Sequence, residues 1–412
     1  MSKKNLAVYF LTFIIFLFGS YFGFNTLLPV SQPNVQKIVD INQNNKKQTG
    51  VLDFAGPRTA VCPINGELFT AEEQKLWETR RPLMVMVENH LDSRPQSGLN
   101  NADIVYEANS EGGITRFMGI FYCNAVKGAG NKYDVGPVRS ARTYFLDIAS
   151  EYSDYPLYTH VGGSNCSAPK DPVTGRQSGP CTTNKKAQAL EQISNYGWMG
   201  KGTWSDLSQF ALSYKACHRE EDRTGSVVAT EHSMYCSSTK LWNVAQSRGL
   251  TNETIINKTL WNKNFRSWSF KQTDLPNSTI DAKTISFDWW GDKAYSVSWT
   301  YDASQKQYLR QNGGVNAIDF NTGQQINSKN IIIQWTKETR SIDEHAHNLY
   351  AMIGTGNAVL LQNGTKTNIT WSKANRTART IFKDKSGNEI NLVPGRTWIE
   401  ILPLGNKVTY EI

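Results

Sequence analysis

Two closely spaced glutamates are the first candidates for chemistry in this sequence. Glu107 and Glu111 bracket Ala-Asn-Ser and precede a Gly-Gly pair, so a turn can point both carboxylates into one cleft. Facing carboxyl groups with different pKa values are what the cleavage of a glycosidic bond requires. The pair therefore predicts catalysis on a glycan, with Glu107 or Glu111 as the general acid. The alternative is a solvated loop or an ion pair, because Arg116 is close enough in the sequence to be a partner.

Arginines in the same stretch are typical of an anion site. Arg139 and Arg142 follow a Gly-Pro turn at the predicted start of a helix, whose free backbone N–H groups favour a carboxylate or phosphate. The alternative is that these arginines pair with nearby carboxylates and only fix the loops. The predicted ligand-binding residues are Arg94, Gln96, Arg116, Arg139, Ser140, Arg142, His160 and His232.

The two histidines of this set each have a structural alternative. His160 stands beside a Gly-Gly turn, and His232 precedes a predicted helix at 239–248. A lone histidine is more often a hydrogen-bonded structural residue than a catalyst. The sequence contains no GxSxG elbow, phosphate loop, dinucleotide fingerprint, HExxH, EF-hand loop or CxxC pair. It therefore predicts no cofactor and no metal site.

The elements that must position these residues are predicted to be strands and helices of one domain. Apolar runs at 83–87, 104–106, 117–122 and 157–161 predict strands, and the polar residues stand where these strands end. Apolar side chains at i, i+3 and i+4 spacing predict an amphipathic helix over 139–152. A shorter helix is predicted over 71–79, with Thr70 as its N-cap.

The second half of the chain is predicted to be β-rich. Its turns include Asn363-Gly364, a strong hairpin signal. Three tryptophans at 299, 371 and 398 fit a sugar-stacking platform, but packing in the core is the commoner role of aromatic strand residues. The predicted strands are 285–290, 295–301, 331–335, 358–361, 368–371 and 397–402. We predict an α/β domain over 61–260 and a β-rich domain over 261–412.

The N-terminal sequence predicts a single membrane anchor. Lys3 and Lys4 precede an uncharged apolar run that, as a helix, spans about 28 Å at ~1.5 Å per residue, close to the thickness of a bilayer core. A cleaved signal peptide is the alternative, but no small-x-small site follows the run. We predict a cytoplasmic tail at 1–5, an anchor at 6–28, a flexible tether at 29–60 and extracytoplasmic domains beyond it.

Cysteine usage and charge agree with that placement. All six cysteines lie beyond the predicted anchor, which suits an oxidising compartment. Proximity suggests pairing Cys166 with Cys181 and Cys217 with Cys236, while Cys123 has the alternative of a buried free thiol. The net charge of +8 is spread without a basic run, so we predict an anionic envelope partner and no nucleic acid.

A family resemblance rests on two long motifs. RPQSGLNNADIVYEANSEGGITRFMGIF, followed by VGPVRSARTYFLDIASEY, closely resembles the YerB-like family of bacterial envelope proteins, which carry N- and C-terminal domains of unknown function. The resemblance weakens over 165–223 and returns in TEHSMYCSSTKLW, SFDWW, NIIIQWT and LVPGRTWIEILP. It implies an α/β (α+β) layered sandwich of two sheets plus helices.

The family pattern also bears on the anchor and on function. Many members are lipoproteins, whereas the first cysteine here is Cys62, so the helix is predicted to replace a lipid. We predict a membrane-anchored extracytoplasmic protein that binds an anionic ligand, peptidoglycan or a partner protein, through an Arg/Glu-rich cleft. The alternative is a glycan-cleaving enzyme.

Overall fold

The computed structural model describes residues 54–412 apart from eight short gaps. These gaps are 129–133, 169–173, 175–178, 201–202, 209–214, 254–257, 259 and 272–279. The predicted tail, the predicted anchor and the predicted tether as far as residue 53 lie outside the described residues. Among the helices that are described, none is long and apolar enough to cross a bilayer.

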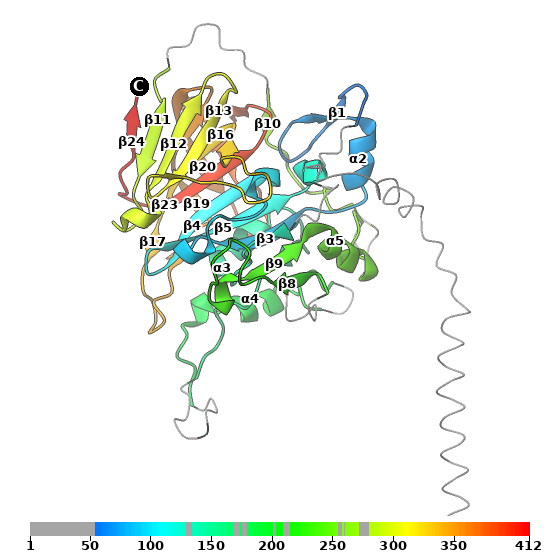
Figure 1. Cartoon of the computed structure of the whole chain (residues 1–412), viewed down its shortest axis with the longest axis vertical. Coiled ribbons are helices and arrows are strands. Elements are labelled where there is room, and N and C mark those ends of the chain that lie inside the picture. Colours follow the sequence, from blue (N-terminus) through cyan, green and yellow to red (C-terminus); the bar gives the residue numbers. More distant parts are fainter. Residues whose placement is uncertain are drawn as a thin grey trace, which may run out of the picture. The chain divides into compact units, whose positions relative to one another are not determined.

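A nine-stranded sheet runs through both halves of the sequence (Figure 1). In spatial order its strands are β21 (Ile381–Lys383), β20 (Thr365–Lys373), β19 (Gly354–Gln362), β16 (Asn330–Thr336), β23 (Thr397–Pro403), β4 (Ile104–Glu111), β5 (Ile114–Phe121), β3 (Leu83–Glu88) and β7 (Leu157–Thr159). The halves meet where β23 pairs in parallel with β4. The two domains predicted from sequence therefore share one sheet, and the described residues form one compact unit.

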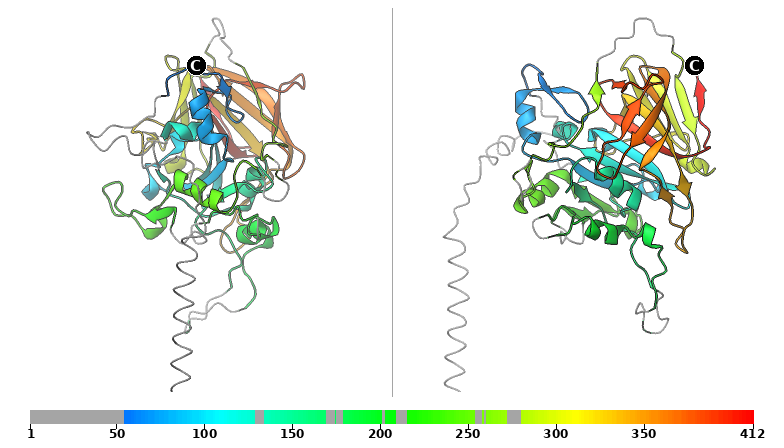
Figure 2. Two further views of the ribbon diagram at one scale, coloured as in Figure 1. Left: turned by 90° about the vertical axis from the view of Figure 1, so that its right-hand side faces the viewer. Right: turned by 180° about the vertical axis from the view of Figure 1, so that it is seen from behind.

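A six-stranded sheet packs against one face of the nine-stranded sheet (Figure 2). Its strands are β14 (Val315–Asn316), β13 (Gln307–Asn312), β12 (Val297–Asp302), β11 (Thr284–Phe287), β24 (Thr409–Glu411) and β15 (Asn327–Ser328). Side chains alternate along each strand, so Val105 and Ile331 of the large sheet meet Ile285 and Val297 of the small one. This apolar layer is the first of two cores.

Helices cover the opposite face of the large sheet and enclose the second core. The helix α3 (Thr143–Ala149) buries Tyr144, Phe145 and Ile148 against alternate residues of the strands, such as Met86 and Ile120. The helices α2 (Ala71–Trp77) and α4 (Ala189–Asn195) add Trp77 and Ile193 to this core. The predicted mixed α+β, β-rich fold is confirmed, with several sheets where two were expected.

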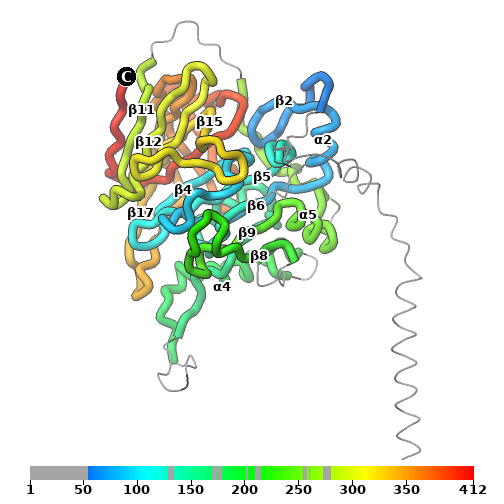
Figure 3. Tube along the Cα trace, viewed as in Figure 1, coloured from blue at the N-terminus to red at the C-terminus, as the bar shows by residue number. Residues whose placement is uncertain are grey.

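A small sheet and one more helix extend the first core beside β3 (Figure 3). The sheet contains β6 (Asp134–Val135), β9 (Met234–Ser237) and β8 (Cys217–Arg219). The helix α5 (Ser238–Ser247) follows β9 directly and buries Leu241 and Trp242. Two-stranded pairs complete the described strands: β1 (Ala60–Val61) with β2 (Leu68–Phe69), β10 (Ser269–Phe270) with β22 (Asn391–Leu392), and β17 (Glu338–Thr339) with β18 (Leu349–Tyr350).

Local signals in the sequence set several boundaries correctly. Thr70 caps α2 and forms a capping box with Glu73. Asn363 and Gly364 both adopt positive φ, of 52° and 75°, in the hairpin between β19 and β20. The three tryptophans proposed as a stacking platform are all buried, which confirms their alternative role in the core.

The predicted start of a helix at Arg139 is wrong. The helix α3 begins at Thr143, with Arg142 as its N-cap residue. The preceding backbone is extended because its N–H groups bond elsewhere, from Arg139 to Met86 O at 3.0 Å and from Ala141 to Gly162 O at 3.0 Å. The expected anion site of free N–H groups at Arg139 is therefore absent.

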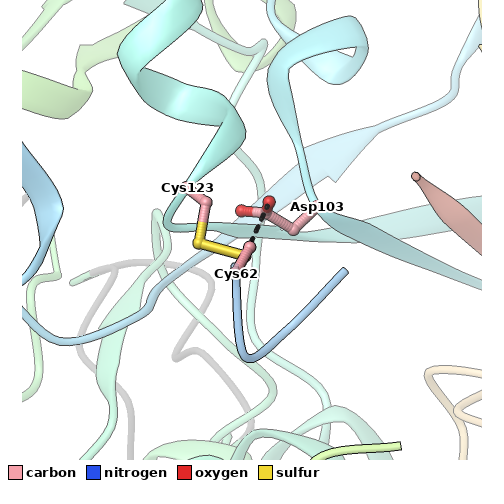
Figure 4. A group of neighbouring side chains, drawn as sticks. All are labelled: Cys62, Asp103 and Cys123. Atoms are coloured by element: carbon pink, nitrogen blue, oxygen red, sulfur yellow. Dashed lines mark hydrogen bonds between the residues drawn. A yellow bond between two sulfur atoms is a disulfide. The ribbon is translucent and has the colours of Figure 1, made fainter. Parts of the chain in front are cut away.

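All six cysteines form disulfides. The guessed pairs, Cys166 with Cys181 and Cys217 with Cys236, are confirmed. Cys123 is not a free thiol, because it pairs with Cys62 and ties the first described segment to the end of β5 (Figure 4). Asp103 lies beside this bridge and accepts the backbone N–H groups of Tyr122 and Asn124. Burial raises the pKa of Asp103 to about 7, against the effect of these donors.

A buried ion triad joins the two sheets. Glu107 of β4 and Glu400 of β23 are register partners, and Arg310 of β13 binds both, at 2.6 Å and 2.8 Å. Trp299 donates to Glu400 at 2.9 Å. Burial and the neighbouring Glu107 carboxylate raise the pKa of Glu400 well above its usual range, against the lowering effect of Arg310.

We expect Glu107→Gln and Glu400→Gln to differ in their effect on the free energy of unfolding. Glu107→Gln leaves Arg310 with Glu400 alone, whose raised pKa favours the neutral form, and should cost about 3–5 kcal/mol. Glu400→Gln mimics a protonated side chain and should cost much less at neutral pH. Because the pKa of Glu400 is raised, its contribution to stability is complete below pH 4.5 and is lost as pH rises through the raised pKa. Glu400→Gln should remove that loss.

Urea titrations followed by tryptophan fluorescence at several pH values measure both effects. Glu389→Gln is the control, because Glu389 pairs with the exposed Arg266 and should change the free energy of unfolding by less than about 1 kcal/mol. Equal costs for Glu107→Gln and Glu400→Gln would contradict this assignment of the proton.

Candidate functional site

Parallel strands bring the polar stretch of the sequence to one edge of the large sheet. The strands β3, β4, β7, β16 and β23 all run in the same direction, so their carboxyl ends lie at one edge. Glu88 ends β3, Glu111 ends β4, and His160 directly follows β7. The predicted grouping of polar residues at strand ends is thus observed, and this edge is where an open α/β sheet places its ligands.

A β-bulge turns Glu111 toward the helical face of the sheet. The register between β4 and β5 shifts at Asn109 and Glu111. Glu111 then forms ion pairs with Arg142 and with Arg116, the latter at 3.3 Å. Ser110 Oγ donates to the same carboxylate at 2.5 Å, so both oxygens of Glu111 act as acceptors. The Glu111 side chain keeps 23% of its surface exposed.

A second ion pair lies next to the first. Glu88 is the register partner of Arg116, and its two oxygens bind Arg139 Nε at 2.9 Å and His232 Nδ1 at 2.8 Å. Arg116 donates to the backbone carbonyl of Ser140 at 3.4 Å. The predicted residues Glu111, Arg116, Arg139, Ser140, Arg142 and His232 therefore come together. We call Arg116, Arg139, Arg142, Glu88 and Glu111 the arginine cluster.

Two guanidinium groups of the arginine cluster are nearly buried. The side chains of Arg116 and Arg142 are 7% and 9% exposed. Burial lowers the pKa of both, to about 10 for Arg142. Among the described residues, the buried atoms Arg116 Nε, Arg142 Nε and Tyr158 Oη have no hydrogen-bond partner, and Tyr158 interacts electrostatically with both arginines. A buried N–H or O–H group without an acceptor lowers the free energy of unfolding, and a bound acceptor restores it.

Glu107 does not share a cleft with Glu111, and the predicted carboxylate pair is wrong. Both residues belong to β4, but Glu107 points to the small sheet and Glu111 to the helical face. Glu107 is fully buried in the ion triad and also accepts from Thr115 Oγ1 at 2.6 Å. A carboxyl group without accessible surface cannot reach a glycan.

His160, Arg94 and Gln96 are engaged within the protein. His160 is buried between Gly162 O at 2.5 Å and Asp206 at 2.8 Å, which supports its structural alternative. All three nitrogens of the Arg94 guanidinium donate to protein oxygens, and Gln96 donates to Asn89 and to the backbone of Glu88. Arg94 and Gln96 still border a cavity of about 610 Å³ whose other lining includes Leu91, Pro95, Ala294, Val315 and Ile318.

Sequence reasoning missed three contributors to the site. The first is Glu88 of the arginine cluster, which was not predicted although it ends β3. His347 lies with its Nε2 4.0 Å from Glu111, and its Nδ1 binds Asp343 at 2.9 Å. Burial and the nearby Arg142 lower the pKa of His347, against the hydrogen bond to Asp343. The spacing Asp-x-x-x-His is the only local sequence signal for the contact between Asp343 and His347. This spacing does not predict the contact of His347 with Glu111, which lies more than two hundred residues earlier in the chain. His90 was also missed, although it stands two residues after the end of β3.

Comparisons with known proteins cover the whole site. Residues 69–251 match the profile described as "Protein of unknown function (DUF3048) N-terminal domain", and residues 285–399 match the one described as "Protein of unknown function (DUF3048) C-terminal domain". The chain is 28% identical over 333 residues to "Putative lipoprotein YerB" of Bacillus subtilis (strain 168), covering 80% of this chain and 83% of that protein. The arginine cluster lies in the first match and His347 in the second.

A solved structure has the same fold. The crystal structure of the YerB protein from Bacillus subtilis aligns with a TM-score of 0.62 at 24% identity. The alignment covers 85% of this chain and 100% of that chain. The likeness shows a shared fold and carries no information about a ligand.

We expect Glu111→Ala to destabilise the protein and to make its stability depend on added anions. The variant leaves Arg116 and Arg142 without their shared carboxylate, which should cost about 3–5 kcal/mol. Formate or phosphate can then occupy the vacated position and should raise the melting temperature of the variant more than that of the wild type. Scanning fluorimetry with Glu389→Ala as the matched control measures this, and equal shifts in all three proteins would contradict it.

Proposed function

This chain belongs to the family described as "Protein of unknown function (DUF3048)", and we propose that it is an extracytoplasmic envelope protein that binds an anionic ligand at the arginine cluster. The YerB-like resemblance found in the sequence is confirmed by this membership. The ligand that we propose is peptidoglycan, through the carboxylate groups of its peptides.

Two observations support the envelope location. Three disulfides consume all six cysteines, as is usual outside the reducing cytoplasm. The Bacillus subtilis relative carries the name "Putative lipoprotein YerB", and lipoproteins are held at membranes. For this chain we propose a single-pass anchor at 6–28 with the N-terminus in the cytoplasm, on the strength of the uncharged apolar run and the lysines before it.

The observation that carries the ligand proposal is the pair of nearly buried guanidinium groups, Arg116 and Arg142. Each has an Nε–H without a partner, and both already bind one carboxylate, that of Glu111. Charge-assisted hydrogen bonds are stronger in such a poorly hydrated place than in water. We propose that a ligand carboxylate binds the same donors, with Arg139, which is 26% exposed, as the more accessible positive charge beside them.

The geometry favours binding over glycan cleavage. A general acid must carry a proton, whereas both oxygens of Glu111 accept from cationic or hydroxyl donors. Glu107 is out of reach of a substrate. Of the two glutamates predicted to act together, only Glu111 has access to solvent.

We expect the full-length protein, purified in detergent, to sediment with isolated sacculi. Arg139→Gln and Arg142→Ala should each lower the affinity about tenfold or more, since a hydrogen bond to a charged group contributes about 1.5–3 kcal/mol. Raising the salt concentration should weaken binding of the wild type. Co-sedimentation at a range of sacculus concentrations measures the affinity.

The matched control for charge is Arg266→Ala, because Arg266 pairs with Glu389 on the surface and takes no part in the arginine cluster. It should bind as the wild type does. Near-ultraviolet circular dichroism verifies that each variant is folded. Unchanged sedimentation of folded Arg139→Gln and Arg142→Ala would refute the proposed site.

The proposed compartment has a separate test. Protein extracted from the cell envelope is denatured in the presence of a maleimide reagent, which labels free thiols. We expect no cysteine to be labelled before reduction and all six cysteines to be labelled after it. Thiols that react without reduction would contradict an oxidising location. Mass spectrometry counts the labels.

A further inference from the structure

We propose that His90, Asp92 and His232 form a binding site for a divalent transition-metal ion, with zinc as the best fit. Each residue offers a ligand atom within 4.8 Å of the other two. Two imidazole nitrogens and one carboxylate oxygen are a ligand set that zinc accepts. The sequence predicted no metal site, because these residues have no recognisable spacing and only the fold brings them together. The inference does not depend on the proposed anionic ligand.

The turn after β3 presents two of the three ligands. His90 caps the short helix η2 (Leu91–Ser93), and its Nδ1 accepts the backbone N–H of Asp92 at 3.2 Å, a hydrogen bond that a metal ion at this nitrogen would replace. The Asp92 carboxylate lies 3.6 Å from the same nitrogen. With 62% of its surface exposed, the Asp92 side chain leaves an ion reachable from solvent.

The third ligand is oriented by the arginine cluster. His232 ends the short helix η6 (Thr230–His232), and its Nδ1 bonds to Glu88 at 2.8 Å. The Glu88 carboxylate accepts a hydrogen bond, so the proton of the neutral His232 ring belongs on Nδ1. The Nε2 atom of His232 then has a free lone pair for a metal. Arg139 holds the other oxygen of Glu88 at 2.9 Å. A histidine backed by a carboxylate in this way is the usual outer shell of a zinc ligand.

The rings must move slightly to meet at one ion. The His90 and His232 rings stack with centroids 4.5 Å apart and planes 8° apart, so their in-plane lone pairs do not yet converge. A tetrahedral zinc ion about 2.1 Å from each ligand sets the ligand atoms about 3.4 Å apart. His90 is the ring that turns, because it stands on a surface turn and is 30% exposed.

Charge also favours a cation at this position. Asp92 supplies one negative charge to the ion directly, and Glu88 supplies a second through His232. Arg139 offsets part of this negative charge, but it binds the Glu88 oxygen that does not contact His232. Three protein ligands leave at least one coordination position for water or for an anionic group of a ligand.

Two other groups among the described residues fit a metal less well. Cys62 and Cys123 lie near Asp103, but their sulfurs are joined to each other (Figure 4). In the group of Asp134, His218 and Glu220, the guanidinium of Arg223 already supplies the cation, at 2.5 Å from Glu220. The site at His90 has no such competitor within its ligand set.

Zinc titration of the chelator-treated, full-length protein in detergent tests the inference. We expect one zinc ion per chain by calorimetry. His90→Asn, Asp92→Asn and His232→Gln should each lower the association constant tenfold or more, and Glu88→Gln should lower it about 10- to 100-fold. His90→Asn retains a side-chain cap for the turn, and Asp92 is exposed, so these two variants preserve the fold.

His218→Ala is the matched control and should bind zinc as the wild type does. The visible absorption of bound cobalt(II) gives a second readout, which should be lost in the same variants that lose zinc. A wild type that binds no zinc, or zinc binding that survives His90→Asn and Asp92→Asn, would overturn the site. Loss of binding in His218→Ala alone would place the metal at the other group and would equally overturn it.

Discussion

Arg310 holds together the place where the two halves of the chain meet. Glu107 and Glu400 stand side by side on β4 and β23, and two neighbouring carboxylates in a buried sheet repel each other. Arg310 reaches both from the small sheet, so the charges match only when all three strands are in register. The triad therefore fixes the register of the large sheet and the position of the small sheet in one interaction.

The same strand carries Glu111 of the arginine cluster on its other face. Once β4 is fixed by Glu107, the bulge after Asn109 decides where Glu111 points. Glu111 then gathers Arg116 from β5 and Arg142 from the start of α3, and Glu88 of the neighbouring strand gathers Arg139 and His232. The site is thus an edge of rigid strands, with its geometry set by pairing inside the sheet.

Local sequence patterns predicted most helices and strands, but they did not predict which distant strands and side chains pair with each other. Alternation and turn residues located most strands, the Asn363-Gly364 hairpin and the Thr70 cap, because these depend on near neighbours. Four members of the arginine cluster, Glu111, Arg116, Arg139 and Arg142, were predicted because they lie close together in the sequence, whereas Glu88 was missed. Glu107 was misplaced because a one-residue bulge reverses the facing of side chains. Arg139 was given to a helix because the pairing of its N–H with Met86 is not visible in the sequence.

The parallel pairing of β4 with β23 has a consequence for how this chain folds. Arg396, just before β23, donates to the backbone carbonyl of Ala102, 294 residues earlier. The first half of the chain therefore presents β4 as an open edge until almost the last strand arrives, and open edges invite pairing with other chains. Such non-local closure is slow. Until β23 has paired with β4, an unfinished chain therefore exposes a strand edge with which another copy can pair.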